Sequence, residues 1–164
     1  MLTQWFDDIR PMTTADIEHI RILESQELSP WNEHDLKEEL VRRHGVQFVV
    51  QKERSCIGWC CASYCRDEAE LLRLVVAHEW RRRGIATALL QKTVMLLDRL
   101  GVVHLFLEVR AGNRAARQFY TKNRFIVAGK RSAYYRQPRE DALMMRSTIS
   151  RKTRDDKDEE HTRL

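Results

Sequence analysis

The sequence predicts one α/β domain, of mixed α+β order, built on a mixed sheet. Segments rich in β-branched and aromatic residues alternate along the chain with segments of helical period. Hydrophobic residues make up 43% of the chain, which is enough to bury a core. The length of 164 residues fits a single domain. We therefore expect six or seven strands, mostly antiparallel, flanked by about four helices.

Two capping patterns organise the first half of the chain. Thr13 precedes Asp16 by three residues, and Asn32 precedes Asp35 by three, so each pair can close a capping box at a helix start. The expected elements are a strand at 9–12, a helix from 13, a helix from 32 to about 45, and strands at 46–51, 56–64 and 70–77.

The second half contains the longest helix and the most apolar strand. Apolar residues of helical spacing predict a helix over 85–100, which Gly101 ends. The strand at 102–109 is almost entirely apolar and should be central. A short helix at 113–122 and strands at 125–128 and 142–146 complete the domain, with a tyrosine-rich loop between the two strands.

Residues 151–164 differ from the rest of the chain. They hold five basic and five acidic residues without periodicity, so we expect a disordered tail after a domain at 1–150. The net charge of +5 then belongs to the domain. No apolar run is long enough to span a membrane, and the first ten residues contain two aspartates and no signal-like core. We expect a cytoplasmic protein.

Four cysteines lie close together, at positions 56, 60, 61 and 65. They form no C-x-x-C pair and have no nearby histidine. In a strand, Cys56 and Cys60 should share one face, too far apart to chelate one ion. We read them as small buried hydrophobes and expect no metal, although a metal or disulfide role stays open.

A candidate anion site lies at the start of the long helix. Gly84 allows a close backbone approach, and the helix N-terminus offers free N–H groups and partial positive charge. This arrangement suits a pyrophosphate, but a solvated helix start is an equal alternative. The segment consists of Arg81, Arg82, Arg83, Gly84, Ile85, Ala86 and Thr87.

Two further residues are candidates for acid–base chemistry. Glu108 lies in the apolar strand, where a carboxylate is either a base facing a cleft or a structural partner of Arg110. Tyr120 follows the helix cap Asn113 by about two turns, on the same helix face. It can deliver a phenolic proton or simply pack at the edge of the core.

These residues together resemble the GNAT acetyltransferases. The segment from Arg81 to Ala86 is similar to the family's acetyl-CoA motif, Arg/Gln-x-x-Gly-x-Gly/Ala. The run Leu107 to Arg110, followed by Asn113 and Tyr120, resembles the RimI branch, the ribosomal-protein-alanine N-acetyltransferases. The resemblance extends over about residues 8–148. One departure is Arg124, where the family often has glycine before Phe125, so we expect Asn123 to supply a left-handed residue there.

The resemblance implies a GNAT fold and roles for individual residues. The backbone of Leu74, Val75 and Val76 would pair with the pantetheine arm of acetyl-CoA, residues 81–87 would hold its pyrophosphate, and Asn113 would lie near the thioester. Glu108 matches the family's general base and Tyr120 its general acid. The implied acceptor is the N-terminal alanine of a small-subunit ribosomal protein, without a direct need for nucleic acid.

The acceptor is the least specific part of the resemblance. Trp31, Tyr134 and Tyr135 could form the walls of a peptide groove, although hairpin packing explains these aromatics equally well. A lysine side chain or a small amine is an alternative acceptor. A non-catalytic acyl-CoA-binding or ribosome-binding module and a basic nucleic-acid binder are further alternatives; the presence of both Glu108 and Tyr120 argues against the module.

Overall fold

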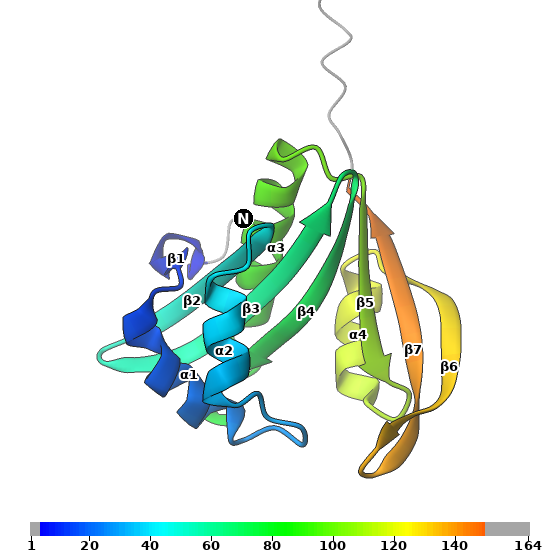
Figure 1. Cartoon of the computed structure of the whole chain (residues 1–164), viewed down its shortest axis with the longest axis horizontal. Helices are drawn as coiled ribbons and strands as arrows, with labels where there is room; N and C mark the ends of the chain where they lie inside the picture. The colour runs from blue at the N-terminus through cyan, green and yellow to red at the C-terminus, as the bar shows by residue number, and fades with distance from the viewer. Residues whose placement is uncertain (1–3, 150–164) are drawn as a thin grey trace, which may run out of the picture.

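A seven-stranded sheet with the order β1-β2-β3-β4-β5-β7-β6 forms the centre of the computed structural model, which describes residues 4–149 (Figure 1). All neighbouring strands are antiparallel except β4 and β5, as the sequence predicted for a mixed sheet. The strands are β1 Ile9–Pro11, β2 Gly45–Lys52, β3 Ser55–Cys65, β4 Glu68–Val76, β5 His104–Arg110, β6 Ile126–Arg136 and β7 Arg139–Thr148. The α-helices are α1 Ile17–Glu24, α2 Glu33–Leu40, α3 Ile85–Arg99 and α4 Arg114–Lys122.

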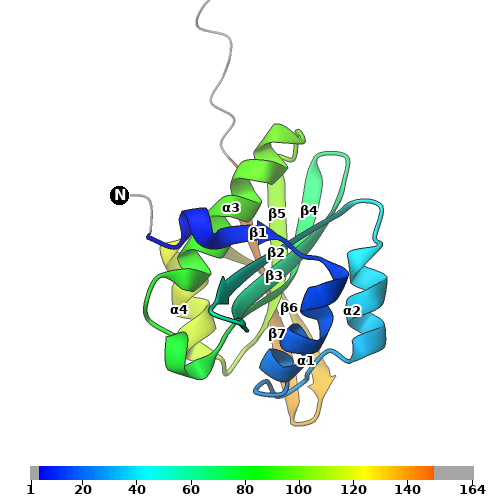
Figure 2. The same ribbon diagram turned by 90° about the vertical axis from the view of Figure 1, so that its left-hand side faces the viewer.

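Helices cover the two faces of the sheet unequally. Helices α1 and α2 lie on one face, called the front here, and α3 and α4 lie on the other, the rear (Figure 2). A rear core joins α3 to β1–β5 and β7, whereas a smaller front core joins α1 and α2 to β2–β4. In the described part of the chain, no helix therefore covers the front of β5, β7 and β6.

The sheet splits between β4 and β5. Only three residue pairs join these strands, from Glu68–His104 to Glu70–Phe106, and the strands then diverge (Figure 1). The remaining part of β4, including Leu74–Val76, pairs with β3 alone. Among the residues that the structure describes, the other edge of this part of β4 faces the gap without a ladder partner.

Three expected features are wrong in detail. Helix α2 ends at Leu40, not near Gly45, because Gln47 Nε2 of β2 donates to the Glu39 carbonyl and the chain turns there. The tyrosine-rich segment belongs to β6, an edge strand whose exposed polar residues hide its extended structure from the sequence pattern. The left-handed residue before Phe125 is Arg124, with φ 67°, not Asn123.

Cys56 lies on the opposite face of β3 from the one expected, whereas Cys60 and Cys61 lie on opposite faces as predicted. A bulge at Ile57, where β3 has one more residue than β2, turns Cys56 to the front with Cys61, while Cys60 points to the rear core. All four are free thiols, and burial raises the pKa of both Cys56 and Cys60 to about 12. Within residues 4–149, no group of three His, Cys, Asp or Glu side chains is placed to hold a metal ion.

The predicted tail at 151–164 lies outside the described residues. Among residues 4–149, no helix is both long and apolar enough to cross a membrane.

Candidate active site

The start of α3 forms one wall of a pocket on the rear face. Gly84 caps the helix with φ 85°, a left-handed conformation that favours glycine, and no side chain caps the first turn. The N–H groups of that turn are therefore available to an anion. The pocket has a volume of about 400 Å³ and its lining includes Leu74, Val75, Val76, Gly84, Ile85, Ala86, Thr87 and Asn113.

The three arginines before Gly84 have different surroundings. Arg81 lines the pocket, but its Nε donates to the Val76 carbonyl at 3.0 Å and its guanidinium pairs with Glu27 at 2.8 Å. Arg82 also lines the pocket, in a left-handed conformation with φ 62°. Arg83 instead stacks over Trp80, 4.8 Å from the ring centroid. Only Arg81 and Arg82 thus line the predicted anion site.

Glu108 and Tyr120 approach one another from opposite faces of the sheet. Glu108 alternates with Leu107 and Val109, which face the rear core, so its carboxylate points to the front. Tyr120 of α4 packs against the rear core, edge to face with Phe119 and Phe125. Both residues line a central pocket of about 200 Å³ at the gap between β4 and β5, together with Asn113.

Burial raises the pKa of the Tyr120 phenol above its usual range. The hydroxyl therefore keeps its proton over the range of pH in which a protein works. The amide of Asn113 is committed to the helix, because its Oδ1 accepts from the Ala116 N–H at 3.1 Å. Asn113 thus positions α4, and with it Tyr120, beside the gap.

Glu108 has a different ionic partner from the one the sequence suggested. Arg131 of β6 places its Nε 2.8 Å from Glu108 Oε1, and the Tyr134 hydroxyl also donates to this carboxylate. Arg110 pairs instead with Glu140 at 3.3 Å and stacks on Tyr135, 4.1 Å from its centroid. Tyr135 lines the central pocket, whereas Tyr134 lies next to Glu108, whose carboxylate raises the pKa of the Tyr134 phenol.

A groove of about 620 Å³ continues from Glu108 across the uncovered front of the sheet. Glu70 of β4 lies on its wall, and burial together with the charge of Glu108 raises the pKa of Glu70. No sequence motif marks Glu70, because its position next to Glu108 depends on the short parallel pairing of β4 with β5. The two carboxylates make this end of the groove attractive to cations.

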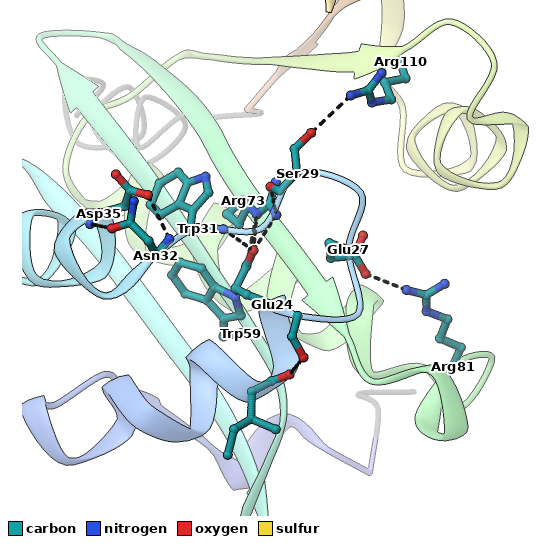
Figure 3. Close-up of polar contacts among 12 residues, drawn as sticks. Glu24, Glu27, Ser29, Trp31, Asn32, Asp35, Trp59, Arg73, Arg81 and Arg110 are labelled. Carbon is teal, nitrogen blue, oxygen red and sulfur yellow. Dashed lines mark hydrogen bonds and ion pairs between the residues drawn. The ribbon is translucent and has the colours of Figure 1, made fainter. Parts of the chain in front are cut away.

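The loop between α1 and α2, residues 25–32, is fastened to both sides of the gap (Figure 3). The carbonyl of Ser29 accepts from Arg73 of β4 at 2.8 Å, and its hydroxyl accepts from Arg110 of β5 at 3.2 Å. Glu27 of the same loop forms an ion pair with Arg81 at the rear pocket. Trp31 of this loop was expected at the site, but the contacts of Glu27 and Ser29 could not be predicted, because their partners are far away in the sequence.

Buried Glu24, at the end of α1, supports that loop. Its carboxylate accepts from Arg73, from the Trp59 indole at 2.8 Å and from the Trp31 backbone N–H at 3.0 Å (Figure 3). Trp31 itself packs edge to face on Trp59, 5.7 Å between centroids. It lines neither the central pocket nor the front groove, so the structure does not bring this predicted substrate residue to the site.

We expect Gly84→Val to weaken coenzyme A binding at least tenfold. A branched side chain at φ 85° is strained by about 1–2 kcal/mol and crowds the helix start that faces the pocket. Isothermal titration with coenzyme A measures the effect.

Gly101→Val is the matched control, because Gly101 has φ 86° at the other end of α3. It should lower the melting temperature similarly and leave coenzyme A affinity unchanged. Equal affinity losses in both variants would show that stability, not the pocket, accounts for the Gly84 effect.

The rear pocket and the gap fit a phosphate-bearing thioester in shape and chemistry. An anion would lie at the uncapped helix start, an extended arm along the open edge of β4, and the reacting end between Tyr120 and Glu108. The residues present thus suit acetyl-CoA.

Comparisons with known proteins agree with this geometry. The family model described as "Acetyltransferase (GNAT) family" matches residues 10–125. A ribosomal protein bS18-alanine N-acetyltransferase of Escherichia coli is 32% identical over 123 residues, which cover 74% of this chain and 82% of that protein. The enzyme of the same name from Haemophilus influenzae is 30% identical over 141 residues, covering 84% and 95%.

Solved structures give the same result. The crystal structure of the ribosomal-protein-alanine N-acetyltransferase from Escherichia coli superposes with a TM-score of 0.81 at 29% identity, covering 90% of this chain and 96% of that one. The chain is therefore an acetyl-CoA-dependent enzyme that belongs to the GNAT acetyltransferase family, in the branch of the ribosomal-protein-alanine N-acetyltransferases.

Proposed function

We propose that the enzyme transfers the acetyl group of acetyl-CoA to the N-terminal alanine amine of a small-subunit ribosomal protein. The observation that carries this proposal is the central pocket, where Glu108 from the front and Tyr120 from the rear meet at the gap between β4 and β5. The names of the similar enzymes support the choice of acceptor.

Acetyl-CoA supplies the activated acyl group. Different residues are proposed to bind its pyrophosphate, its pantetheine arm and its thioester. The helix start at residues 84–87, with Arg81 and Arg82, holds the pyrophosphate. The open edge of Leu74–Val76 offers backbone groups to the pantetheine arm in the manner of an added strand. Asn113 fixes the α4 start beside the thioester.

Glu108 is the proposed general base. An α-amine has a pKa of about 7.7–8.0, so a large share of it is protonated near neutral pH and a modest base suffices to free its lone pair. Glu108 faces the uncovered front, from which an acceptor can approach, and it takes the proton as the amine attacks. The Glu108 side chain is 18% exposed at the end of the front groove, so an acceptor amine in the groove can contact it.

Tyr120 is the proposed general acid, which gives its proton to the departing sulfur. We expect Tyr120→Phe to lower kcat about 100-fold, because the ring contacts with Phe119 and Phe125 remain and only the hydroxyl is lost. Because burial raises the pKa of the phenol, the hydroxyl of the wild type keeps its proton beyond the pH at which an exposed tyrosine ionises. The kcat of wild type and variant, measured against pH, should therefore run parallel at alkaline pH. A Tyr120→Phe enzyme that keeps its kcat within about threefold of the wild type would contradict the assignment as acid. An alkaline decline confined to the wild type would instead show that the phenol loses its proton in this range, against the raised pKa.

The acceptor chain is proposed to enter from the front, between the loop at residues 25–32 and the β6–β7 hairpin. Tyr135 and Ser29 line the central pocket, and Tyr134 lies beside the base. Ribosomal proteins are cytoplasmic substrates, so we propose that the enzyme acts in the cytoplasm. Trp31 supports this region only through the loop that it anchors.

Mass spectrometry tests the function directly. The enzyme and acetyl-CoA are mixed with a peptide that begins Ala-Arg and contains one lysine, and with the same peptide blocked at its N-terminus. We expect one acetyl group on the α-amine of the first peptide and none on the second. Acetylation of the lysine alone, or of neither peptide, would overturn the acceptor assignment and favour another amine.

A further inference from the structure

We propose that Arg131 is a built-in stand-in for the acceptor's ammonium group: it neutralises Glu108 in the empty site and is displaced when the cationic amine of the acceptor arrives. This inference rests on the proposed role of Glu108. It concerns a residue of β6 that none of the roles assigned above uses.

The first support is the shape of β6. The strand carries two extra residues relative to β7 between Arg131 and Tyr135, and Ala133 within this bulge has φ 51°. Asp141 of β7 holds the bulge, since it accepts from the Ala133 N–H at 2.7 Å and pairs with Lys130 at 2.8 Å. A bulge of this kind re-aims side chains, and here Arg131 and Tyr134 both point to the Glu108 carboxylate.

The second support is the balance of charge around Glu108. Glu70 of β4 faces it across the short parallel pairing, and Tyr134 and Tyr135 of β6 contribute neutral phenols. Arg131 is the cation paired with Glu108 among the described residues. Two neighbouring carboxylates favour a cation between them, and an acceptor amine that arrives protonated carries the same charge as the guanidinium it would replace.

The third support is how weakly Arg131 is held. Its side chain is 54% exposed, and its remaining contacts are a long hydrogen bond to the Met144 sulfur and a distant stack on Tyr134. Because the guanidinium is more than half exposed, water screens its attraction to Glu108, and a cation of matching charge can replace it. Glu108 then receives the ammonium proton, becomes neutral, and no longer attracts Arg131 until the proton has left.

The experiment measures peptide affinity for the enzyme already loaded with coenzyme A, which carries no acetyl group to transfer. Isothermal titration uses a peptide with a free N-terminal alanine and the same peptide acetylated at its N-terminus. Arg131→Gln removes the competing cation, so it should raise the affinity for the free-amine peptide about threefold to tenfold. The affinity for the acetylated peptide should not change. Arg131→Lys should return the affinity toward that of the wild type.

Two controls separate this exchange from a general change in charge. Arg136→Gln removes the same charge from an exposed position of the same strand, and it should change neither affinity. In a Glu108→Gln background, Arg131→Gln should have no further effect, because the partner is absent. Weaker binding in Arg131→Gln, equal tightening of both peptides, or an effect that persists without Glu108 would each overturn the proposal.

Failure of the acceptor assignment is seen separately. If the wild type does not bind the free-amine peptide, that assignment is wrong, and the same variants are compared with whichever cationic amine the wild type acetylates. The displacement itself is overturned when the wild type binds a cationic acceptor and the Arg131 variants give any of the three contrary results named above.

Discussion

Glu108→Gln should lower kcat at least 100-fold while the affinity for acetyl-CoA stays within about twofold of the wild type. The amide keeps the shape of the side chain but cannot take a proton, and a positioned base contributes about 10²–10⁴ to a rate. Glu108 lines the central pocket and the front groove but not the rear pocket, so the anion site is unaffected. Steady-state kinetics with both substrates, together with titration of coenzyme A, measures the two quantities.

Glu70→Gln is the matched control for this substitution. It removes the same charge from the same groove, beside Glu108 but away from the central pocket. Its kcat should remain within about threefold of the wild type. If Glu108→Gln loses coenzyme A affinity and turnover together, Glu108 is a structural residue and not the base.

Glu24→Gln should lower the free energy of unfolding by about 3 kcal/mol. Glu24 is fully buried, and its carboxylate accepts from Arg73, Trp59 and Trp31. The amide leaves the guanidinium of Arg73, only 20% exposed, without a counter-charge, which is the costly way to break a buried ion pair. For a domain of this size, the melting temperature should fall by roughly 6–12 °C, measured by calorimetry or circular dichroism.

Glu18→Gln tests whether burial is the cause. Glu18 also lies on α1 and pairs with Arg21, but both side chains are about half exposed or more. The free energy of unfolding should change by less than about 0.5 kcal/mol. Similar losses in the two variants would contradict a special role for the buried pair.

The sequence was sufficient wherever local chemistry decides the structure. The capping boxes at Thr13 and Asn32 form at the predicted helix starts. Gly84 and Gly101 lie at the two ends of the long helix, both with positive φ. Periodicity identified the helices and the buried strands because one face of each is apolar. It failed at β6, whose residues are exposed on an edge and whose structure comes from pairing with β7.

The site was only partly accessible from the sequence, for a related reason. The resemblance to a family pointed to Glu108, Tyr120 and the start of α3, since these are carried by short motifs. The partners of Glu108 come from a bulge in β6 and from the register of β4 against β5, and no motif encodes either. Trp31 shows the reverse case: its ring, expected at the groove, packs on Trp59, and its backbone N–H donates to the buried carboxylate of Glu24.

The short junction of β4 with β5 also has a consequence for motion. Within residues 4–149, three residue pairs form the only strand ladder that joins β1–β4 to β5–β7, so this junction can serve as a hinge between the two parts of the sheet. Opening at this hinge would widen the central pocket without unfolding either half. A ligand arm laid along Leu74–Val76 would replace the missing ladder and slow amide hydrogen exchange there, coupling cofactor binding to the rigidity of the whole sheet.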